Sequence, residues 1–204
     1  MRQPGRLDAA RLKTMSGAAL SGIALTLALV GSARAQLLGD ELRAFRPEAD
    51  TYVSAARPEA NFGRARTLRA AGAPRQIIFL RFRLEELKGS ITSATLLLHA
   101  QAKTRTSYQV RGVHEDEWRE RRLTFENAPR LSLRYVASKP VRRGIWSAVD
   151  VTSFVGDDTG RVSLAVTTRS PLGVVFESRE SDQGPRLVIR TAKGSKKKRP
   201  ASSP

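Results

Sequence analysis

The stretch IFLRFRL, residues 78–84, decides the fold class, because an apolar side chain recurs at every even-numbered position. Successive side chains of a β-strand point to opposite faces, so this pattern predicts a strand with one buried row and one outward row that carries Arg81 and Arg83. The stretch ATLLLH, residues 94–99, alternates in the same way and places His99 on its outward row. Both stretches are therefore predicted to be half-buried strands.

Similar short stretches follow along the chain, and glycine, proline and aspartate separate them. The further predicted strands span residues 108–113, 146–149, 162–168, 173–178 and 186–191. The one helix-like segment covers residues 150–155, where Asp150 or Thr152 could cap a single turn. About eight or nine short strands joined by polar turns favour an all-β fold, an antiparallel β-sandwich of jelly-roll type.

The N-terminal segment has the order of features that is typical of a signal peptide. Basic residues precede an apolar run at residues 18–30, and the small-residue pattern Ala33-Arg34-Ala35 follows. The run is too short to span a bilayer, and cleavage after this pattern would start the mature chain at Gln36. We therefore expect residues 1–35 to be removed and the protein to be exported to the periplasm, the cell surface or the medium. The sequence has no second apolar segment of the kind that would predict a transmembrane helix.

Composition divides the rest of the chain. Residues 36–204 have the length of one domain, and because the sequence has no cysteine, a packed core rather than disulfides must stabilise it. We assign residues 36–48 to a lead-in, 49–192 to the domain and 193–204 to a tail. The tail is basic, has no apolar residue larger than alanine and is predicted to be disordered. The net charge of +17 falls to about +8 for the domain when the signal segment and the tail are left out.

An ordered series of short motifs gives a more specific indication. The motifs are DTYV (residues 50–53), NFG (61–63), FLRFRL (79–84), ITSATLLL (91–98), WRE (118–120), LTFENAP (123–129), VDVTSFV (149–155) and FESRE (176–180). In this order they resemble the DNRLRE domain, a group that overlaps carbohydrate-binding module family 96. The resemblance covers about residues 49–191. It implies a jelly-roll module that binds polysaccharides, acidic ones such as alginate among them. The chain departs from the family at Phe125, where members usually have tryptophan.

Two types of side chain are candidates for ligand binding. Planar guanidinium groups pair with carboxylates, sulfates or phosphates in a bidentate manner, which favours the outward Arg81, Arg83 and Arg169. Ring side chains could contact sugars, and the candidates of this type are His99, Tyr108 and Trp118. For Trp118 the alternative is stronger: together with Phe125 it would plug a loop against the sandwich, and Asn127 would bond backbone groups nearby. In the FESRE motif, we expect the charged side chains to tie a loop.

Catalysis and cofactors have little support in the sequence. Only His99 and His114 could titrate near neutral pH, and the motifs of nucleophilic hydrolases, zinc proteases and phosphate-binding loops are absent. We therefore expect no enzyme activity and no required cofactor. Asp50 and Asp150 could supply oxygen ligands to a structural Ca²⁺, although the chain has no dense acidic loop.

These observations predict a secreted, non-catalytic carbohydrate-binding module for an anionic polysaccharide of the cell surface or matrix. The alternative is a structural surface protein whose basic tail docks on a phosphate-rich envelope. Nucleic acid would bind only non-specifically, through charge.

Overall fold

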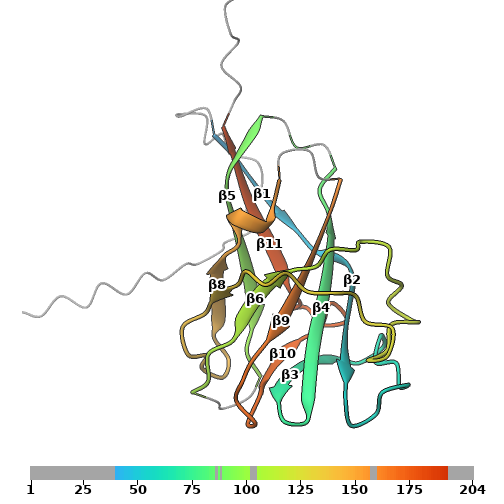
Figure 1. The fold of residues 1–204 in the computed structure, drawn as a ribbon. Coiled ribbons are helices and arrows are strands. Elements are labelled where there is room, and N and C mark those ends of the chain that lie inside the picture. The colour runs from blue at the N-terminus through green and yellow to red at the C-terminus, as the bar shows by residue number, and fades with distance from the viewer. Residues whose placement is uncertain (1–39, 86, 88, 102–104, 157–159, 193–204) are drawn as a thin grey trace, which may run out of the picture. The chain divides into compact units, whose positions relative to one another are not determined.

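The computed structural model describes residues 40–85, 87, 89–101, 105–156 and 160–192 (Figure 1). The signal segment 1–35, the mature start at Gln36 and the tail 193–204 lie outside the described residues. Where the chain is described, no helix is long and apolar enough to cross a membrane.

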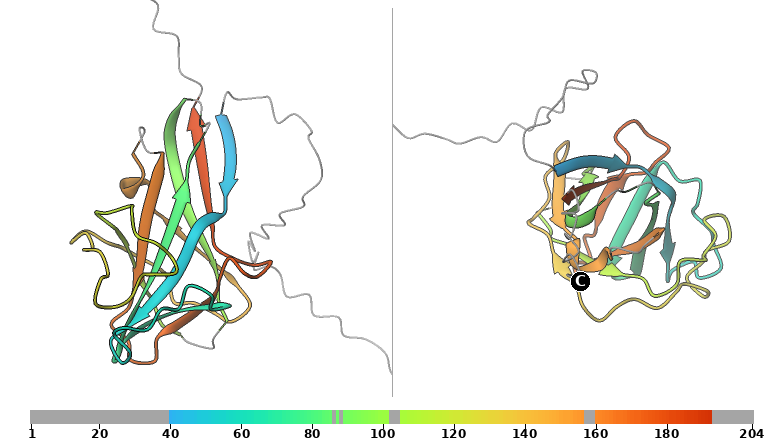
Figure 2. Two further views of the ribbon diagram at one scale, coloured as in Figure 1. Left: turned by 90° about the vertical axis from the view of Figure 1, so that its right-hand side faces the viewer. Right: turned by 90° about the horizontal axis from the view of Figure 1, so that it is seen from above.

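The described residues form two antiparallel sheets (Figure 2). The four-stranded sheet has the order β1-β11-β5-β8, and the seven-stranded sheet has the order β10-β3-β4-β9-β6-β7, with β2 also paired to β4. The strands are β1 (Asp40–Phe45), β2 (Pro47–Ser54), β3 (Thr67–Gly72), β4 (Arg75–Arg83), β5 (Ser90–His99), β6 (Gln109–Gly112), β7 (Val136–Ala137), β8 (Trp146–Asp150), β9 (Arg161–Thr167), β10 (Val174–Glu177) and β11 (Arg186–Ala192). The expected all-β sandwich is confirmed.

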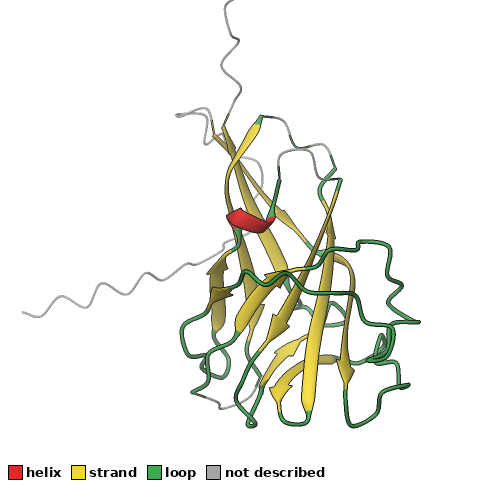
Figure 3. Cartoon of the chain, in the orientation of Figure 1, coloured by secondary structure: helices red, strands yellow, loops and turns green. Residues whose placement is uncertain are grey.

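The strands that the sequence did not predict are short or weakly alternating. β3 and β7 are examples, and β1 lies in the segment that we had assigned to a lead-in. β1 pairs with β11 over its whole length, and Phe45 packs against the core. The sandwich therefore starts earlier than expected. The helix-like segment forms one 3-10 turn, η1 (Thr152–Phe154) (Figure 3).

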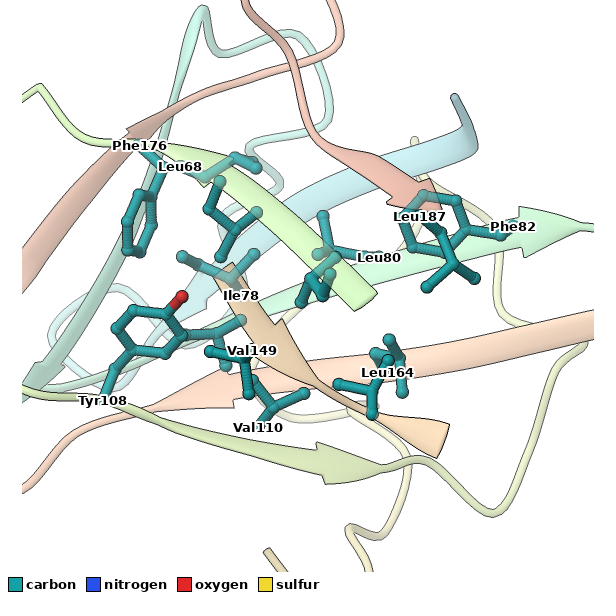
Figure 4. Packing of buried hydrophobic residues seen from close by; sticks show 14 of the residues in the cluster. Leu68, Ile78, Leu80, Phe82, Tyr108, Val110, Val149, Leu164, Phe176 and Leu187 are labelled. Atoms are coloured by element: carbon teal, nitrogen blue, oxygen red, sulfur yellow. The ribbon is translucent and has the colours of Figure 1, made fainter. Parts of the chain in front are cut away.

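The main core lies between the two sheets, as the alternating stretches predict. From β4 it receives Ile78, Leu80 and Phe82, all fully buried (Figure 4), and β5 contributes Leu96 and Leu98. Each such side chain stabilises the fold by about 1.5–3 kcal/mol relative to an exposed position. The register predicted for both strands is therefore confirmed.

A second, smaller core covers the outer face of the seven-stranded sheet. We expected this face to carry a mixed, solvent-facing row, but Ile77 and Phe79 of β4 are buried there. The chain between β6 and β7 crosses β9 and β4 (Figure 1) and packs Trp118 and Leu123 onto them. We call residues 114–130 the covering loop.

Polar contacts hold the covering loop in place. The Trp118 indole N–H donates to the Ser163 hydroxyl at 3.1 Å, and the ring meets Phe79 edge-on with 6.1 Å between centroids. The Asn61 side-chain amide donates to the carbonyls of Glu120 and Leu123 at 2.7 and 2.8 Å. These contacts confirm the expectation that Trp118 plugs a loop against the sandwich, and they give the NFG motif a structural role.

A glycine is required where that motif approaches the loop. A Cβ atom on Gly63 would lie 2.4 Å from the carbonyl oxygen of Glu120, a backbone atom that cannot move aside cheaply. The third residue of the motif thus lets two backbone segments pack closely.

Candidate functional site

The covering loop leaves one end of the outer face open as a groove of about 710 Å³. We call it the arginine groove, and its lining residues come from β3, β4, β6, β9 and the loop segments beside them. Four of these residues are arginines: Arg75, Arg111, Arg130 and Arg169. Among the described residues that line the groove, none is acidic. Its volume lies in the range of small-molecule sites.

Strand alternation explains why these side chains meet. Gln109 pairs with Thr167 across β6 and β9, and Arg111 pairs with Ala165 two positions along. Gln109, Arg111, Ala165 and Thr167 therefore lie on the outer face of the sheet. The covering loop occupies this same face further along the strands. Arg75 opens β4 at the same end. The groove is thus the part of the outer face that the loop leaves open.

A second hollow of about 330 Å³ continues the arginine groove. The two share Gln109, Thr168 and Arg169, and the second one adds Arg105. This continuity gives an elongated basic surface, which suits a polymer better than a compact ligand.

Three of the groove arginines are exposed and available. Within the described part of the chain, the side chains of Arg75, Arg130 and Arg169 have no hydrogen bond or ion pair to another residue. Arg111 differs, because its guanidinium donates to the carbonyls of Ser132 and Leu133 at 3.0 and 3.1 Å. The open groove therefore carries positive charge that nearby protein groups do not balance.

The other end of the outer face has a different balance of positive and negative charge. Arg81 and Arg83, two of the predicted ligand-binding residues, both donate to the carboxylate of Glu48, and Arg161 lies 3.2 Å from the same group. Arg81 also donates to the carbonyls of Asp116 and Trp118 and lies over the Trp118 ring, 4.8 Å from its centroid. Burial would raise the pKa of Glu48, but the hydrogen bonds from Arg83 and Arg81 and the charges of Arg81 and Arg161 hold it below its usual value.

These contacts correct the placement of Arg81 and Arg83 on a free outward row. The row exists, but Glu48 binds both guanidinium groups, the covering loop also binds that of Arg81, and Glu85 also binds that of Arg83. The hollow beside them is lined by Arg83 and Arg161 and by three carboxylates, those of Glu85, Asp116 and Glu117. An anionic ligand would meet net negative charge in this hollow. Arg169 lies instead in the arginine groove, which has no acidic residue among its described lining residues.

With this geometry known, comparison with known proteins decides the family. The family model described as carbohydrate-binding module family 96 matches residues 42–191. The chain belongs to carbohydrate-binding module family 96. No curated protein matches this family 96 module.

Among the solved structures that match this family 96 module is one that is similar to part of it. It concerns "the promiscuous specificity of the carbohydrate-binding modules from the beta-sandwich super family", and it is 13% identical with a TM-score of 0.26. The match covers 76% of this chain and 56% of that chain, so the module spans little more than half the length of that structure. At this TM-score the similarity carries no argument.

The ring side chains predicted to contact sugar are not available at the surface of the module. Tyr108 is 1% exposed, its hydroxyl lies 2.9 Å from that of Ser147, and burial raises its pKa to about 12. His99 does lie on an outer face, that of the four-stranded sheet. However, it is only 7% exposed, since Trp146 of β8 packs against it with 5.2 Å between ring centroids. The expectation of an outward, accessible His99 is therefore corrected, and Trp118 is buried under its own loop.

The two aspartates considered as calcium ligands lie in different sheets, Asp50 in β2 and Asp150 in β8, so they do not form one site. Asp150 accepts bonds from the Thr152 hydroxyl and N–H at 2.6 and 2.9 Å, and these bonds lower its pKa. No group of three side chains suited to a metal ion occurs among the residues that the structure describes.

Asp50 belongs to a buried clamp between three segments. Its carboxylate accepts the Arg179 backbone N–H at 2.6 Å, and Glu120 of the covering loop accepts both the Asp50 N–H and the Arg179 guanidinium at 2.9 Å. Burial raises the pKa of Asp50 to about 7, although the Arg179 bond opposes this. Arg179 thus ties the FESRE motif to the covering loop, as the sequence suggested.

Sequence reasoning missed Arg75, Arg111 and Arg130. A usable signal existed for Arg111, because the stretch 108–113 alternates and puts positions 109 and 111 on one face. For the other two the sequence holds no such signal, since one lies at a strand end and one in a loop.

Proposed function

We propose that this module is exported and binds an anionic polysaccharide in the arginine groove without catalysing a reaction. The observation that carries the proposal is the groove itself, with four arginines and no acidic residue among its described lining residues. The apolar run at residues 18–30 and the cleavage pattern that follows it at residues 33–35 support export.

The physical chemistry of the groove favours a polymer as ligand. An exposed guanidinium–carboxylate pair contributes only about 0.2–1 kcal/mol, so one pair cannot hold a ligand. A chain with an anionic group on each sugar can occupy Arg75, Arg169 and Arg105 in succession, and the contributions then add within one molecule. Binding of this kind weakens as salt screens the exposed pairs.

The same residue set supports a non-catalytic role. Most glycosidases hydrolyse a glycosidic bond with a pair of carboxyl groups that flank it. Among the described lining residues the groove offers arginine, glutamine, serine, threonine and apolar side chains, and neither His99 nor His114. We propose that these residues retain the polymer and leave it intact.

The experiment is a titration of the mature protein with alginate and polygalacturonate oligomers, with a neutral glucan for comparison. We expect the Arg75→Ala/Arg169→Ala variant to bind the acidic oligomers about tenfold more weakly, because losing two exposed pairs removes about 1.4 kcal/mol. The matched control is Arg142→Ala/Arg143→Ala, which removes the same charge from exposed positions that line neither hollow. Its affinity should match that of the unaltered protein.

Two results would contradict the proposal. Equal loss in both double variants would mean that net charge alone drives binding. Retention that disappears only when residues 193–204 are deleted would favour the alternative, docking of the basic tail on a phosphate-rich envelope.

A further inference from the structure

The segment that follows the covering loop, residues 131–135, carries two exposed apolar side chains beside the arginine groove. Leu133 is 92% exposed and lines the groove, and Tyr135, two residues further, is 48% exposed. Single apolar side chains are common on protein surfaces, so it is the position of these two that matters. Their position next to a basic groove indicates a surface that contacts something with both apolar and anionic parts.

Arg111 fixes this segment in place. Its guanidinium donates to the carbonyls of Ser132 and Leu133 at 3.0 and 3.1 Å and to the Gln109 side chain at 2.9 Å. The backbone adds a bond from Ser132 N–H to the Gly112 carbonyl at 2.8 Å. The segment is therefore tied to β6.

The same guanidinium also orients the tyrosine ring. The Cζ atom of Arg111 lies 5.0 Å from the centroid of the Tyr135 ring, a distance at which a cation and an aromatic face attract each other. Because Arg111 uses its donors on protein acceptors, its part in the groove is to hold the ring and the loop. The exposed half of the ring is left to face a ligand.

We propose that Tyr135 is a stacking platform for a sugar ring of the bound polymer, held in position by Arg111. A pyranose ring has a face of C–H groups that packs on an aromatic surface, and its hydroxyl and carboxylate groups point outward to polar partners. The stacking proposal rests on the proposed function and narrows the ligand class. The groove takes an anionic polymer built from sugar rings, and charge alone is insufficient for binding it.

The test compares an acidic polymer with sugar rings against one without. Isothermal titration of the mature protein with polygalacturonate oligomers and with linear inorganic polyphosphate separates the two contributions. We expect Tyr135→Ala to weaken polygalacturonate binding about three- to tenfold, the size of an aromatic contact. Tyr135→Phe should bind within about twofold of the unaltered protein, since it keeps the ring. Any polyphosphate binding should be the same with and without Tyr135.

Melting curves check that each variant is folded. The Tyr135→Leu variant, which keeps apolar bulk without a flat ring, is titrated with the same two polymers. If Tyr135→Ala binds polygalacturonate as the unaltered protein does, or loses the same factor on polyphosphate, the stacking proposal is wrong. That failure differs from failure of the proposed function, in which the unaltered protein binds no uronate polymer at all.

A double-mutant cycle tests the positioning role of Arg111. If Arg111 acts through the ring, Arg111→Gln should cost affinity in the unaltered protein and little in the Tyr135→Ala background. Additive losses would show that Arg111 does not act through Tyr135.

Discussion

The buried carboxyl of Asp50 should make the stability of the domain depend on pH in an unusual direction. Asp50 is 3% exposed and lies in the clamp with Arg179 and Glu120. Burial raises its pKa in the folded domain to about 7, whereas an unfolded chain would titrate near the ordinary value of 3.8. The folded state therefore holds this proton more tightly than the unfolded state does.

The sign and the size of the effect follow from linkage. Because the folded pKa is the higher one, the stabilisation by protonated Asp50 is complete below the unfolded pKa, near pH 4. It is lost as pH rises through the folded pKa, near pH 7. A difference of about three pH units corresponds to about 4 kcal/mol, at 1.36 kcal/mol per unit. The Asp50→Asn variant cannot ionise there, so it should lack this dependence while still accepting the Arg179 N–H.

The measurement is urea unfolding of the domain and of Asp50→Asn at several values between pH 4 and pH 8. Groups that do not interact with Asp50 titrate alike in both proteins, so the difference between the two free energies of unfolding reports Asp50 and its coupling to the clamp. We expect Asp50→Asn to gain on the unaltered domain by up to about 4 kcal/mol as pH rises across this range. A difference that stays constant, or that changes in the opposite direction, would refute the argument that burial outweighs the Arg179 bond.

Two further predictions concern the core and the leader. Phe82→Ala should lower the free energy of unfolding by about 3–5 kcal/mol in urea titrations, because the ring is fully buried. Arg83→Ala removes an exposed ion pair and should lower it by at most about 1 kcal/mol. The reverse order would contradict the register of β4. N-terminal sequencing of protein recovered outside the cytoplasm should start at Gln36 or within about three residues of it, and an intact Met1 there would argue against cleavage.

The sequence was most informative where local geometry decides the outcome. Alternation in residues 78–84 and 94–99 predicted both strands and their inward rows, because a period of two has only one consistent arrangement against a core. The ordered motifs predicted the family, and in the NFG motif Gly63 has a visible packing role, because it lets its backbone approach the covering loop.

The candidate site was harder to predict because it depends on what covers a sheet. Arg81 and Arg169 look equivalent in the sequence, as basic residues on or near an outward row. Only the path of the covering loop distinguishes them: it buries the neighbours of the first and stops short of the second. A loop of this length returns to the sheet through long-range contacts, which no local pattern encodes.

Thus the chain by itself determined the all-β class, the inward rows and the carbohydrate-binding family, because these follow from periodicity and from short motifs. Tertiary structure alone decided which charges remain available. Whether an arginine binds a ligand or the protein depends on the acceptors that folding brings next to it. Glu48 is about 35 residues from Arg83 in sequence but 2.9 Å from it in space, whereas Arg75 and Arg169 meet in an open groove with no carboxylate among its described lining residues.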